Sequence, residues 1–353
     1  MLEITDIPVE GYERVHRAVD PARGLHAIIA VHSTVLGPAL GGMRLWPYRS
    51  VEEAKTDVLR LARGMTYKAA CAGLQLGGGK SVILGKPEDK TPALFEAMGE
   101  FVASFGGTYI TAEDVNTKVE DMGHVAKQTR FVAGLAGKSG NPSPKTAWGC
   151  FLGLQATLQE AFGSPEVMGK VVAIEGAGSV GSVYADLVAK AGGRIVVADI
   201  KQESAERVAK ATGGAVVSPT EIHRTVCDVF APCALGGSLN DETIPHLRCK
   251  AVVGAANNQL LEPRHGEMLL ERDILYAPDY VVNAGGLINV FDEYHYSNYD
   301  EKRSLANAEK IRGNLREIFR ISREERISTA QAADDFAERR IEAARARRAG
   351  AAR

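Results

Sequence analysis

The sequence predicts an α/β protein of two domains, the second of which is a doubly wound sheet of the Rossmann type. Its 353 residues, 45% hydrophobic and 24% charged, suit a globular chain with material for about two domains of ~150 residues. Strand-like and helix-like patterns alternate through both halves. A segment rich in glycine, serine and proline, 138–149, interrupts this alternation. We therefore place the domains at 1–140 and 141–324, with a C-terminal helix at about 325–353 packing back on the first domain.

The first half opens with an apolar, β-branched run at 25–35 that predicts a strand. The following LGPALGGMR has the composition of a turn. Over 50–70, apolar or small residues recur at the spacing of an amphipathic helix, which carries Lys68 at its C-terminal end.

Three glycines then lead through Lys80 into a short strand, SVILG. A second helix is expected over 91–105, and the strand GTYITAED ends at Asp114. The first domain is therefore predicted to be α/β.

In the second half, helices ending at Lys190 and spanning 204–212 separate short apolar runs. The runs predicted as strands are KVVAIEG, RIVVAD, DVFAPC, AVVGAANN and ILYAPDYVVNAGG. Parallel strands joined by crossover helices are typical of a doubly wound sheet. Helical sequence returns from 300 to about 345, and the basic RARRAGAAR is expected to be a frayed, solvated tail.

Composition excludes several classes of partner. With 42 basic and 44 acidic residues the formal charge is -2, so no strong field favours nucleic acid or an anionic membrane. The N-terminus lacks a signal peptide and no stretch approaches the ~18 apolar residues of a spanning helix, so we expect a cytoplasmic protein. An odd number of cysteines without a C-x-x-C pair predicts neither a disulfide framework nor a metal site. The five cysteines are Cys71, Cys150, Cys227, Cys233 and Cys249.

A glycine motif between a predicted strand and helix indicates a dinucleotide site. Its residues are Gly176, Ala177, Gly178, Ser179, Val180 and Gly181. In G-x-G-x-x-G the first glycine permits a tight turn, the second lets the backbone approach a pyrophosphate, and the third allows close packing of helix and strand. Asp199, at the end of the next strand, is placed to bind the ribose hydroxyls and repel a 2′-phosphate. NAD is therefore predicted rather than NADP. Lys201, a nearby cation, is the one residue that would favour the 2′-phosphate of NADP instead.

A second glycine cluster precedes Lys80 but does not form an ATP-binding P-loop. That motif needs a glycine where Leu74 stands, and its lysine should open a helix rather than a strand. Lys80 lies twelve residues after Lys68 in a largely apolar stretch. Burial and like charge both favour a neutral lysine that can act as a base, although two ordinary surface lysines remain an alternative.

Six sequence blocks, read in order, resemble the Glu/Leu/Phe/Val dehydrogenase superfamily, in particular its leucine and phenylalanine dehydrogenase branch. The blocks are GPALGGMR, RLARGMTYKAACAGLQLGGGKSVI, TAEDVN, APCALGG, GAANNQL and YAPDYVVNAGGLINV. The resemblance implies an N-terminal substrate domain, a C-terminal nucleotide domain and a cleft between them. It further implies oxidative deamination, a homo-oligomer (dimer or octamer) and no nucleic acid or membrane partner.

The resemblance also assigns roles to residues. Lys68 would bind the substrate carboxylate, Lys80 would activate water, and Asp114 would exchange protons with the amino group. Backbone at Gly41 and Gly42 would approach the substrate. Asn258 would hold the substrate and the nicotinamide ribose, and Asn257, Thr146 and Asn283 would bind the cofactor, the last two at the carboxamide. For the paired asparagines a helix-capping turn is the alternative, for Thr146 a helix start and for Asp114 a turn.

Four residues bear on the substrate. Glutamate dehydrogenases of this superfamily carry a lysine where this chain has Leu40 and a serine where it has Val290. Burying a glutamate side chain without these partners would cost several kcal/mol, so an apolar amino acid is predicted. Ala112 and Val290 resemble the leucine enzymes, whereas Leu287 resembles the phenylalanine and tryptophan enzymes. Leucine, valine or isoleucine is favoured and phenylalanine or tryptophan is the alternative; a non-catalytic NAD-binding protein is the alternative of a different class.

Overall fold

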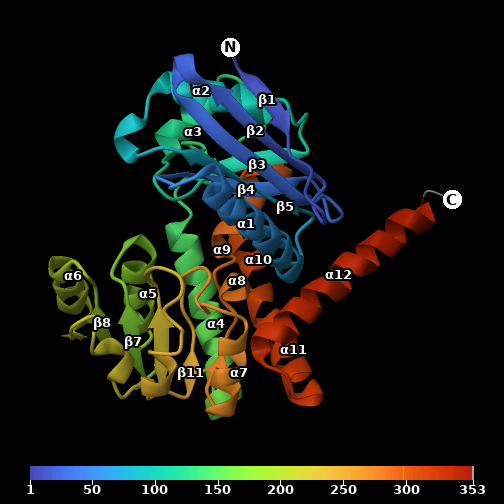
Figure 1. The fold of residues 1–353 in the computed structure, drawn as a ribbon. Coiled ribbons are helices and arrows are strands. Elements are labelled where there is room, and N and C mark those ends of the chain that lie inside the picture. Colours follow the sequence, from blue (N-terminus) through green and yellow to red (C-terminus); the bar gives the residue numbers. More distant parts are fainter. Residues whose placement is uncertain (297, 352–353) are drawn as a thin grey trace. The chain divides into compact units, whose positions relative to one another are not determined.

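The computed structural model describes residues 1–296 and 298–351 and divides into two compact units (Figure 1). Unit 1 takes Met1–Asn141, Val290–Glu301 and the chain from Ala337 onward. Unit 2 takes Pro142–Asn289 and Lys302–Phe336.

Unit 1 is built on a six-stranded sheet in the order β1-β2-β3-β5-β4-β6. Neighbours from β1 to β5 are antiparallel, whereas β4 is parallel to both β5 and β6. The strands are β1 (Glu3–Asp6), β2 (Arg14–Asp20), β3 (Leu25–Ser33), β4 (Ala39–Trp46), β5 (Gly77–Leu84) and β6 (Tyr109–Glu113). The helices that lie wholly in this unit are η1 (Pro21–Arg23), α1 (Val51–Ala72), η2 (Pro87–Asp89), α2 (Pro92–Ala103) and α3 (Val119–Val125).

Alternation along β3 divides the apolar residues of unit 1 between two cores. Ile29 and Val31 belong to a cluster with Phe95 and other residues of α2, whereas Ile28 belongs to a second cluster with Val58 of α1. Successive side chains of a strand point to opposite faces of the sheet. Helices α1 and α2 therefore cover opposite faces, as Figure 1 shows.

Both glycine segments of unit 1 lie in strands, which corrects the prediction of a turn at LGPALGGMR and of a glycine lead-in before Lys80. A Cβ added at Gly41 of β4 would lie 1.7 Å from the carbonyl oxygen of Gly79 in β5. The glycines therefore allow two adjacent strands to approach more closely than side chains would permit.

Unit 2 is built on a six-stranded, all-parallel sheet in the order β12-β11-β10-β7-β8-β9. The strands are β7 (Val171–Glu175), β8 (Arg194–Ala198), β9 (Ala215–Val216), β10 (Val229–Pro232), β11 (Ala251–Val252) and β12 (Leu275–Tyr276). The helices that lie wholly in this unit are α4 (Ser143–Phe162), α5 (Ser179–Lys190), α6 (Gln202–Thr212), η3 (Ile222–Arg224), η4 (Ile244–His246), α7 (Arg264–Glu271), α8 (Asp279–Val282) and α11 (Lys310–Glu325).

The strand order of unit 2 confirms the predicted doubly wound fold. From β7 the chain moves outward through β8 and β9, then returns to the other side of β7 and continues through β10, β11 and β12. The order therefore reverses beside β7, and ligands of such sheets bind at the carboxyl ends of the strands at this point.

Two predicted segments of unit 2 have a different structure. Helix α4 begins at Ser143, inside the segment predicted as a loop, with prolines at its start. The predicted strand ILYAPDYVVNAGG forms only the two residues of β12, followed by α8 and the start of α9 (Gly285–His295). A Cβ at Gly285 would lie 1.9 Å from the carbonyl oxygen of Lys145, so glycine here permits close packing against α4.

The units are not simply consecutive in sequence. Helices α9, α10 (Glu301–Ala308) and α12 (Thr329–Ala351) each contain residues of both units. Residues 290–301 belong to unit 1 and 325–336 to unit 2, which differs from the predicted ranges. In unit 1, the buried Glu293 carboxylate of α9 accepts hydrogen bonds from the amides of Gly134 (3.0 Å) and Ser139 (3.1 Å) and from the Ser139 hydroxyl. The predicted frayed tail instead continues α12 to Ala351, and residues 352–353 lie outside the described structure.

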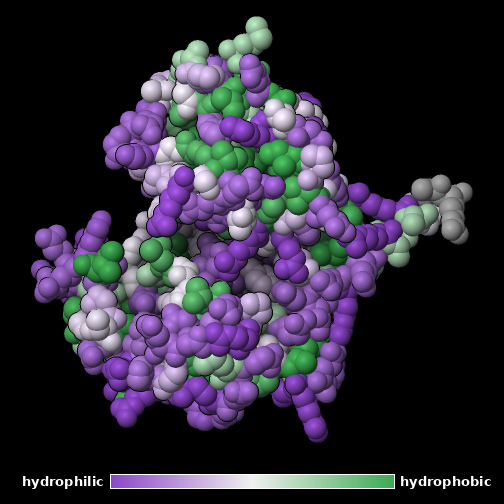
Figure 2. Space-filling view, in the orientation of Figure 1, coloured by the Kyte–Doolittle hydropathy of each residue, from purple (hydrophilic) through white to green (hydrophobic). Residues whose placement is uncertain are grey.

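Most of the face shown in Figure 2 is hydrophilic, with apolar residues in small separate patches. Among residues 1–296 and 298–351, no helix is both long and apolar enough to cross a membrane.

Candidate functional site

A buried ion pair joins Lys80 and Asp114 in unit 1. The Lys80 ammonium lies 2.8 Å from Oδ2 of Asp114, and the lysine side chain is 8% exposed. Lys80 is in β5 and Asp114 directly follows β6, and these strands are separated by β4. The two side chains therefore meet across an intervening strand. Gly42 of β4 makes this possible, because a Cβ there would lie 2.7 Å from Cβ of Asp114.

Arg44 is a second cation on Asp114, which the sequence analysis did not identify. Its Nε donates to Asp114 Oδ2 at 3.3 Å, and its Nη1 donates to Asp57 of α1 at 3.0 Å. The Tyr48 hydroxyl also donates to Asp57, at 2.6 Å. Because Arg44 follows Gly42 by two residues in the same strand, it lies on the same face of the sheet. That spacing is the sequence signal that could have revealed it.

These cations determine the charge of Asp114. Burial opposes the ionised carboxyl, but the nearby Lys80 and Arg44 outweigh burial, so the pKa of Asp114 lies below its usual range. The turn after β6 is also fixed: the Asp114 amide donates to the Thr117 hydroxyl, which in turn donates to the carbonyl of Met43 in β4. Asp114 is thus a positioned carboxylate in hydrogen-bond contact with a lysine.

Lys68 lies on α1, two residues after Thr66, and is half-buried. The helix packs closely on β5, because a Cβ at Gly78 would lie 2.1 Å from the Thr66 amide nitrogen. The close contact places this part of α1 over the strand that carries Lys80. The register of β4 and β5 pairs Leu40 with Gly78 on this face of the sheet.

The predicted apolar substrate residues of unit 1 are buried beside the ion pair. Leu40 precedes Gly42 by two residues in β4, and Ala112 precedes Asp114 by two at the end of β6, so each shares a sheet face with its partner. Val290, on α9, is also buried in unit 1. Gly41 points to the opposite face, where its carbonyl accepts a hydrogen bond from Tyr109. Leu287 belongs to unit 2.

The glycine motif of unit 2 forms the turn from β7 into α5, at the switch point of the sheet. Gly176 has a left-handed φ of 105°, and a Cβ at Gly181 would lie 2.1 Å from the Gly176 carbonyl oxygen, so the fold itself requires both glycines. A Cβ at Gly178 would meet nothing within 4 Å. Gly178 is also the N-cap of α5, whose first turn has no side-chain cap. The open space and uncapped amides fit a bound pyrophosphate.

Asp199 follows β8 and is hydrogen-bonded to the glycine turn. Its Oδ2 accepts from the Ala177 amide at 2.7 Å, and its Oδ1 accepts from the Lys201 amide at 2.8 Å. Beside it, Ile200 is 89% exposed, and Leu235, after β10, is 80% exposed. Both follow strands that flank β7. Sequence reasoning did not identify these exposed apolar side chains, although Ile200 is adjacent to the predicted acid.

Asn283 connects the remaining polar residues of unit 2. Its side-chain nitrogen donates to Oδ1 of Asn257 at 2.9 Å and to the Ala255 carbonyl at 3.1 Å. Its Oδ1 is buried without a hydrogen-bond partner among the described residues. Asn258 has a left-handed φ of 53°, the conformation of a turn. Thr146 lies in the first turn of α4, and a Cβ at Gly286 would lie 2.6 Å from its hydroxyl.

Comparisons with known proteins agree with this geometry. Residues 12–131 match the family described as Glu/Leu/Phe/Val dehydrogenase, dimerisation domain, and residues 196–349 match Glutamate/Leucine/Phenylalanine/Valine dehydrogenase. A leucine dehydrogenase of Geobacillus stearothermophilus is 50% identical over 338 residues, covering 95% of this chain and 92% of that protein. A phenylalanine dehydrogenase of Lysinibacillus sphaericus is 46% identical over 343 residues (95% and 90%). The crystal structure of L-tryptophan dehydrogenase from Nostoc punctiforme has a TM-score of 0.82 at 43% identity and covers 95% of this chain and 97% of its own.

Proposed function

The chain belongs to the Glu/Leu/Phe/Val dehydrogenase family, and on that premise we propose that it reversibly deaminates an apolar L-amino acid to its 2-oxo acid and ammonia. It is an amino-acid dehydrogenase that uses a nicotinamide cofactor. The observation that carries the proposal is the 2.8 Å contact between Lys80 and Asp114, because it combines a buried cation with an ionised carboxylate. These are the two proton-transfer groups that deamination requires.

Each group in unit 1 has a role in this reaction. Lys68 binds the substrate carboxylate. Asp114, held as a carboxylate by Lys80 and Arg44, accepts a proton from the substrate ammonium, which leaves a neutral amine. The bound cofactor supplies the hydride acceptor. Once Lys80 has released its proton to solvent, the neutral amine orients a water molecule toward the Cα carbon and takes up its proton. The ammonium formed in this step stabilises the negative oxygen that develops.

The cofactor we propose is NAD. The space at Gly178 and the uncapped start of α5 accommodate the pyrophosphate, and the Asp199 carboxylate favours ribose hydroxyls over a 2′-phosphate. Asn283 Oδ1, which has no partner among the described residues, would accept a hydrogen bond from the nicotinamide carboxamide, and Thr146 in the same unit would hold the same group. Exposed Ile200 and Leu235 provide apolar surface for the adenine.

The substrate we propose is a branched aliphatic amino acid, with phenylalanine or tryptophan as the second candidate. The relatives include leucine, phenylalanine and tryptophan dehydrogenases. Leu40 and Ala112 are buried on the sheet face that carries the ion pair, and neither offers a polar partner for a side-chain carboxylate. One methylene in an apolar pocket changes discrimination by only about 1–3 kcal/mol. The order among apolar substrates is therefore sensitive to single substitutions.

Unit 1 contains the residues that match a dimerisation domain, so we propose a homo-oligomer assembled through that unit. A non-catalytic NAD-binding protein is the alternative function. It is disfavoured because binding of a dinucleotide would not require Lys80, Asp114 and Arg44 to be held together in a different unit.

The test is NADH formation with NAD⁺ and a panel of L-leucine, L-valine, L-isoleucine, L-phenylalanine, L-tryptophan and L-glutamate at mildly alkaline pH. Turnover of at least one apolar substrate with none of glutamate supports the proposal, and the rates rank the substrates. Failure of the whole panel, together with NAD⁺ binding detected by calorimetry, would instead support the non-catalytic alternative. The same panel with NADP⁺ tests the cofactor assignment.

A further inference from the structure

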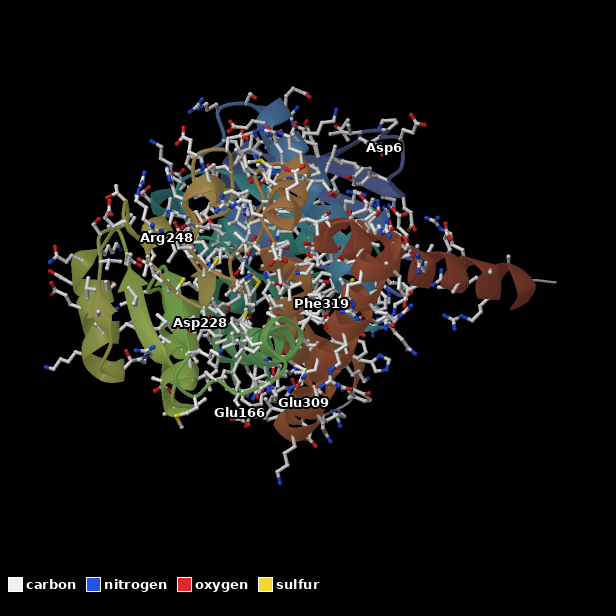
Figure 3. All side chains as sticks on the ribbon, turned by 90° about the horizontal axis from the view of Figure 1, so that it is seen from below. Asp6, Glu166, Asp228, Arg248, Glu309 and Phe319 are labelled. Carbon is white, nitrogen blue, oxygen red and sulfur yellow. The ribbon has the colours of Figure 1, made fainter. Side chains whose placement is uncertain are left out.

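Two cysteines of unit 2 lie opposite each other, in register, on neighbouring extended segments. Cys227 lies two residues before β10 and Cys249 two residues before β11. Val226 and Arg248 form a parallel bridge, and the Cys227 amide donates to the Arg248 carbonyl at 3.2 Å. The next residues in this register are the two cysteines themselves, so their side chains point the same way. Their chain neighbours Asp228 and Arg248 are labelled in Figure 3.

The two thiols are in hydrogen-bond contact. This hydrogen bond raises the pKa of Cys227, while it lowers the pKa of Cys249 against the opposing effect of burial. The positive charge of Arg272, which donates to the neighbouring Leu247 carbonyl at 3.0 Å, acts in the same direction on Cys249. Neither cysteine is in a disulfide, and both are partly exposed at the margin of the apolar cluster of unit 2.

We propose that Cys227 and Cys249 are a modification site, at which a hydroperoxide oxidises the two thiols to a reversible intramolecular disulfide. The Cα atoms of neighbouring strands are about 4.8 Å apart, within the ~4.4–6.8 Å that a disulfide spans. Among the described residues, no group of three histidine, cysteine, aspartate or glutamate side chains is arranged to hold a metal ion. The pair is therefore suited to redox chemistry rather than to metal binding.

The reaction balances as two thiols and one hydrogen peroxide giving one disulfide and two waters. The Cys249 thiolate attacks one peroxide oxygen, the O–O bond breaks, and the leaving oxygen takes a proton to form water. The resulting sulfenic acid is attacked by Cys227, whose thiol proton leaves with the hydroxyl as the second water. The two sulfurs lose two electrons in total and the peroxide gains them. A dithiol reductant reverses the change by thiol–disulfide exchange.

The other three cysteines provide controls within the same chain. Cys71 and Cys150 are buried, and burial raises the pKa of Cys233 to about 12, so the reactive thiolate of Cys233 is scarce at neutral pH. Oxidation at low peroxide should therefore be confined to the proposed pair. The disulfide would also restrict the segment between β10 and β11, which raises the unfolding temperature of the oxidised protein.

The experiment treats the full-length protein with a small molar excess of hydrogen peroxide and then alkylates the remaining thiols under denaturing conditions. We expect the alkylated thiols to fall by two of the five, a linked peptide containing Cys227 and Cys249, and full recovery after dithiothreitol. Cys227→Ser and Cys249→Ser should each abolish the linked peptide, while Cys71→Ser and Cys233→Ser should retain it. Cys227→Ala and Cys249→Ala repeat the test without a new hydroxyl.

Three results would overturn the proposal. One is stable sulfinic acid on Cys249 with a free thiol on Cys227. Another is a linkage that involves Cys71, Cys150 or Cys233. The third is a disulfide between two chains, which a non-reducing gel distinguishes from the intramolecular bond.

Discussion

Replacing Arg44 with methionine should shift the pH dependence of the reaction more than its maximal rate. Arg44 and Lys80 both contact Oδ2 of Asp114, at 3.3 Å and 2.8 Å. The substitution removes one cation and leaves the other, so the Asp114 carboxylate loses part of its stabilisation. Because a cation lowers the pKa of a neighbouring carboxyl, loss of Arg44 raises the pKa of Asp114.

The separation of the charges sets the size of the shift. Two unit charges 3.3 Å apart interact by about 5 kcal/mol at an effective dielectric constant of ~20. Arg44 is also paired with Asp57 at 3.0 Å, so much of its charge is already neutralised. We expect the pKa of Asp114 to rise by an amount in the lower part of the ~1–3 units by which one adjacent arginine lowers the pKa of a carboxyl.

The assay is log kcat/KM for the best apolar amino acid across pH. Asp114 must be ionised to accept a proton, so the acidic limb of the profile should move to higher pH by about 1–2 units in Arg44→Met while the plateau remains. Arg44→Lys should restore part of the shift. Glu113, whose pKa burial raises, is the neighbouring carboxyl and is unchanged in these variants.

Asp57→Asn is the matched control, because it removes the competing partner of Arg44 and leaves both cations on Asp114. Its acidic limb should stay in place or move to lower pH. If Arg44→Met lowers activity equally at every pH, Arg44 supports the structure without tuning Asp114. The reasoning from the ion pairs would then be refuted.

Three further predictions concern other residues. Lys80→Ala should lower kcat by at least about 100-fold, because proton transfer and water activation both fail. The NAD⁺ affinity measured by calorimetry should be unchanged. Near-normal turnover would contradict the catalytic role that we propose for Lys80. Asp199→Ala should weaken NAD⁺ binding about tenfold and reduce the preference for NAD⁺ over NADP⁺. The reason is the loss of the ribose contact and of the 2.7 Å hydrogen bond from the Ala177 amide. An unchanged preference for NAD⁺ would show that the adenosine site lies elsewhere. Glu293→Ala should lower the free energy of unfolding by about 3 kcal/mol in denaturant titrations, because buried amides lose their acceptor; an effect below about 1 kcal/mol would mean that water replaces the carboxylate.

The nucleotide-binding half could be predicted because its signals are local. The strand, the glycine turn and the helix are consecutive in sequence, and Asp199 directly follows the next strand along the chain. The steric reasons for two of the three glycines also lie within the turn or beside it: Gly181 packs on Gly176, and Gly176 packs on Ala234. Among the described residues no atom lies within 4 Å of a Cβ at Gly178, and this open space fits the pyrophosphate that we propose there.

Unit 1 could not be predicted in the same way, because its site depends on strand order. Nothing local indicates that β4 lies between β5 and β6, or that Lys80 and Asp114 meet across it. Gly41 and Gly42 read as a turn when only their neighbours in sequence are considered. In the sheet they are strand residues, one of which admits the Gly79 backbone and the other the Asp114 side chain.

The same topology explains why Arg44 was missed and why it matters. A strand that passes between Lys80 and Asp114, the two groups that we propose transfer protons, must carry no side chain at the point of contact, and Gly42 meets that requirement. Two residues later, the same face of the strand is again directed at Asp114, and there a side chain is tolerated only if it complements the carboxylate. An arginine held by Asp57 satisfies that condition and keeps Asp114 ionised while Lys80 contacts it. Gly42, which permits the ion pair, and Arg44, which lowers the pKa of Asp114, therefore both follow from the place of β4 between β5 and β6.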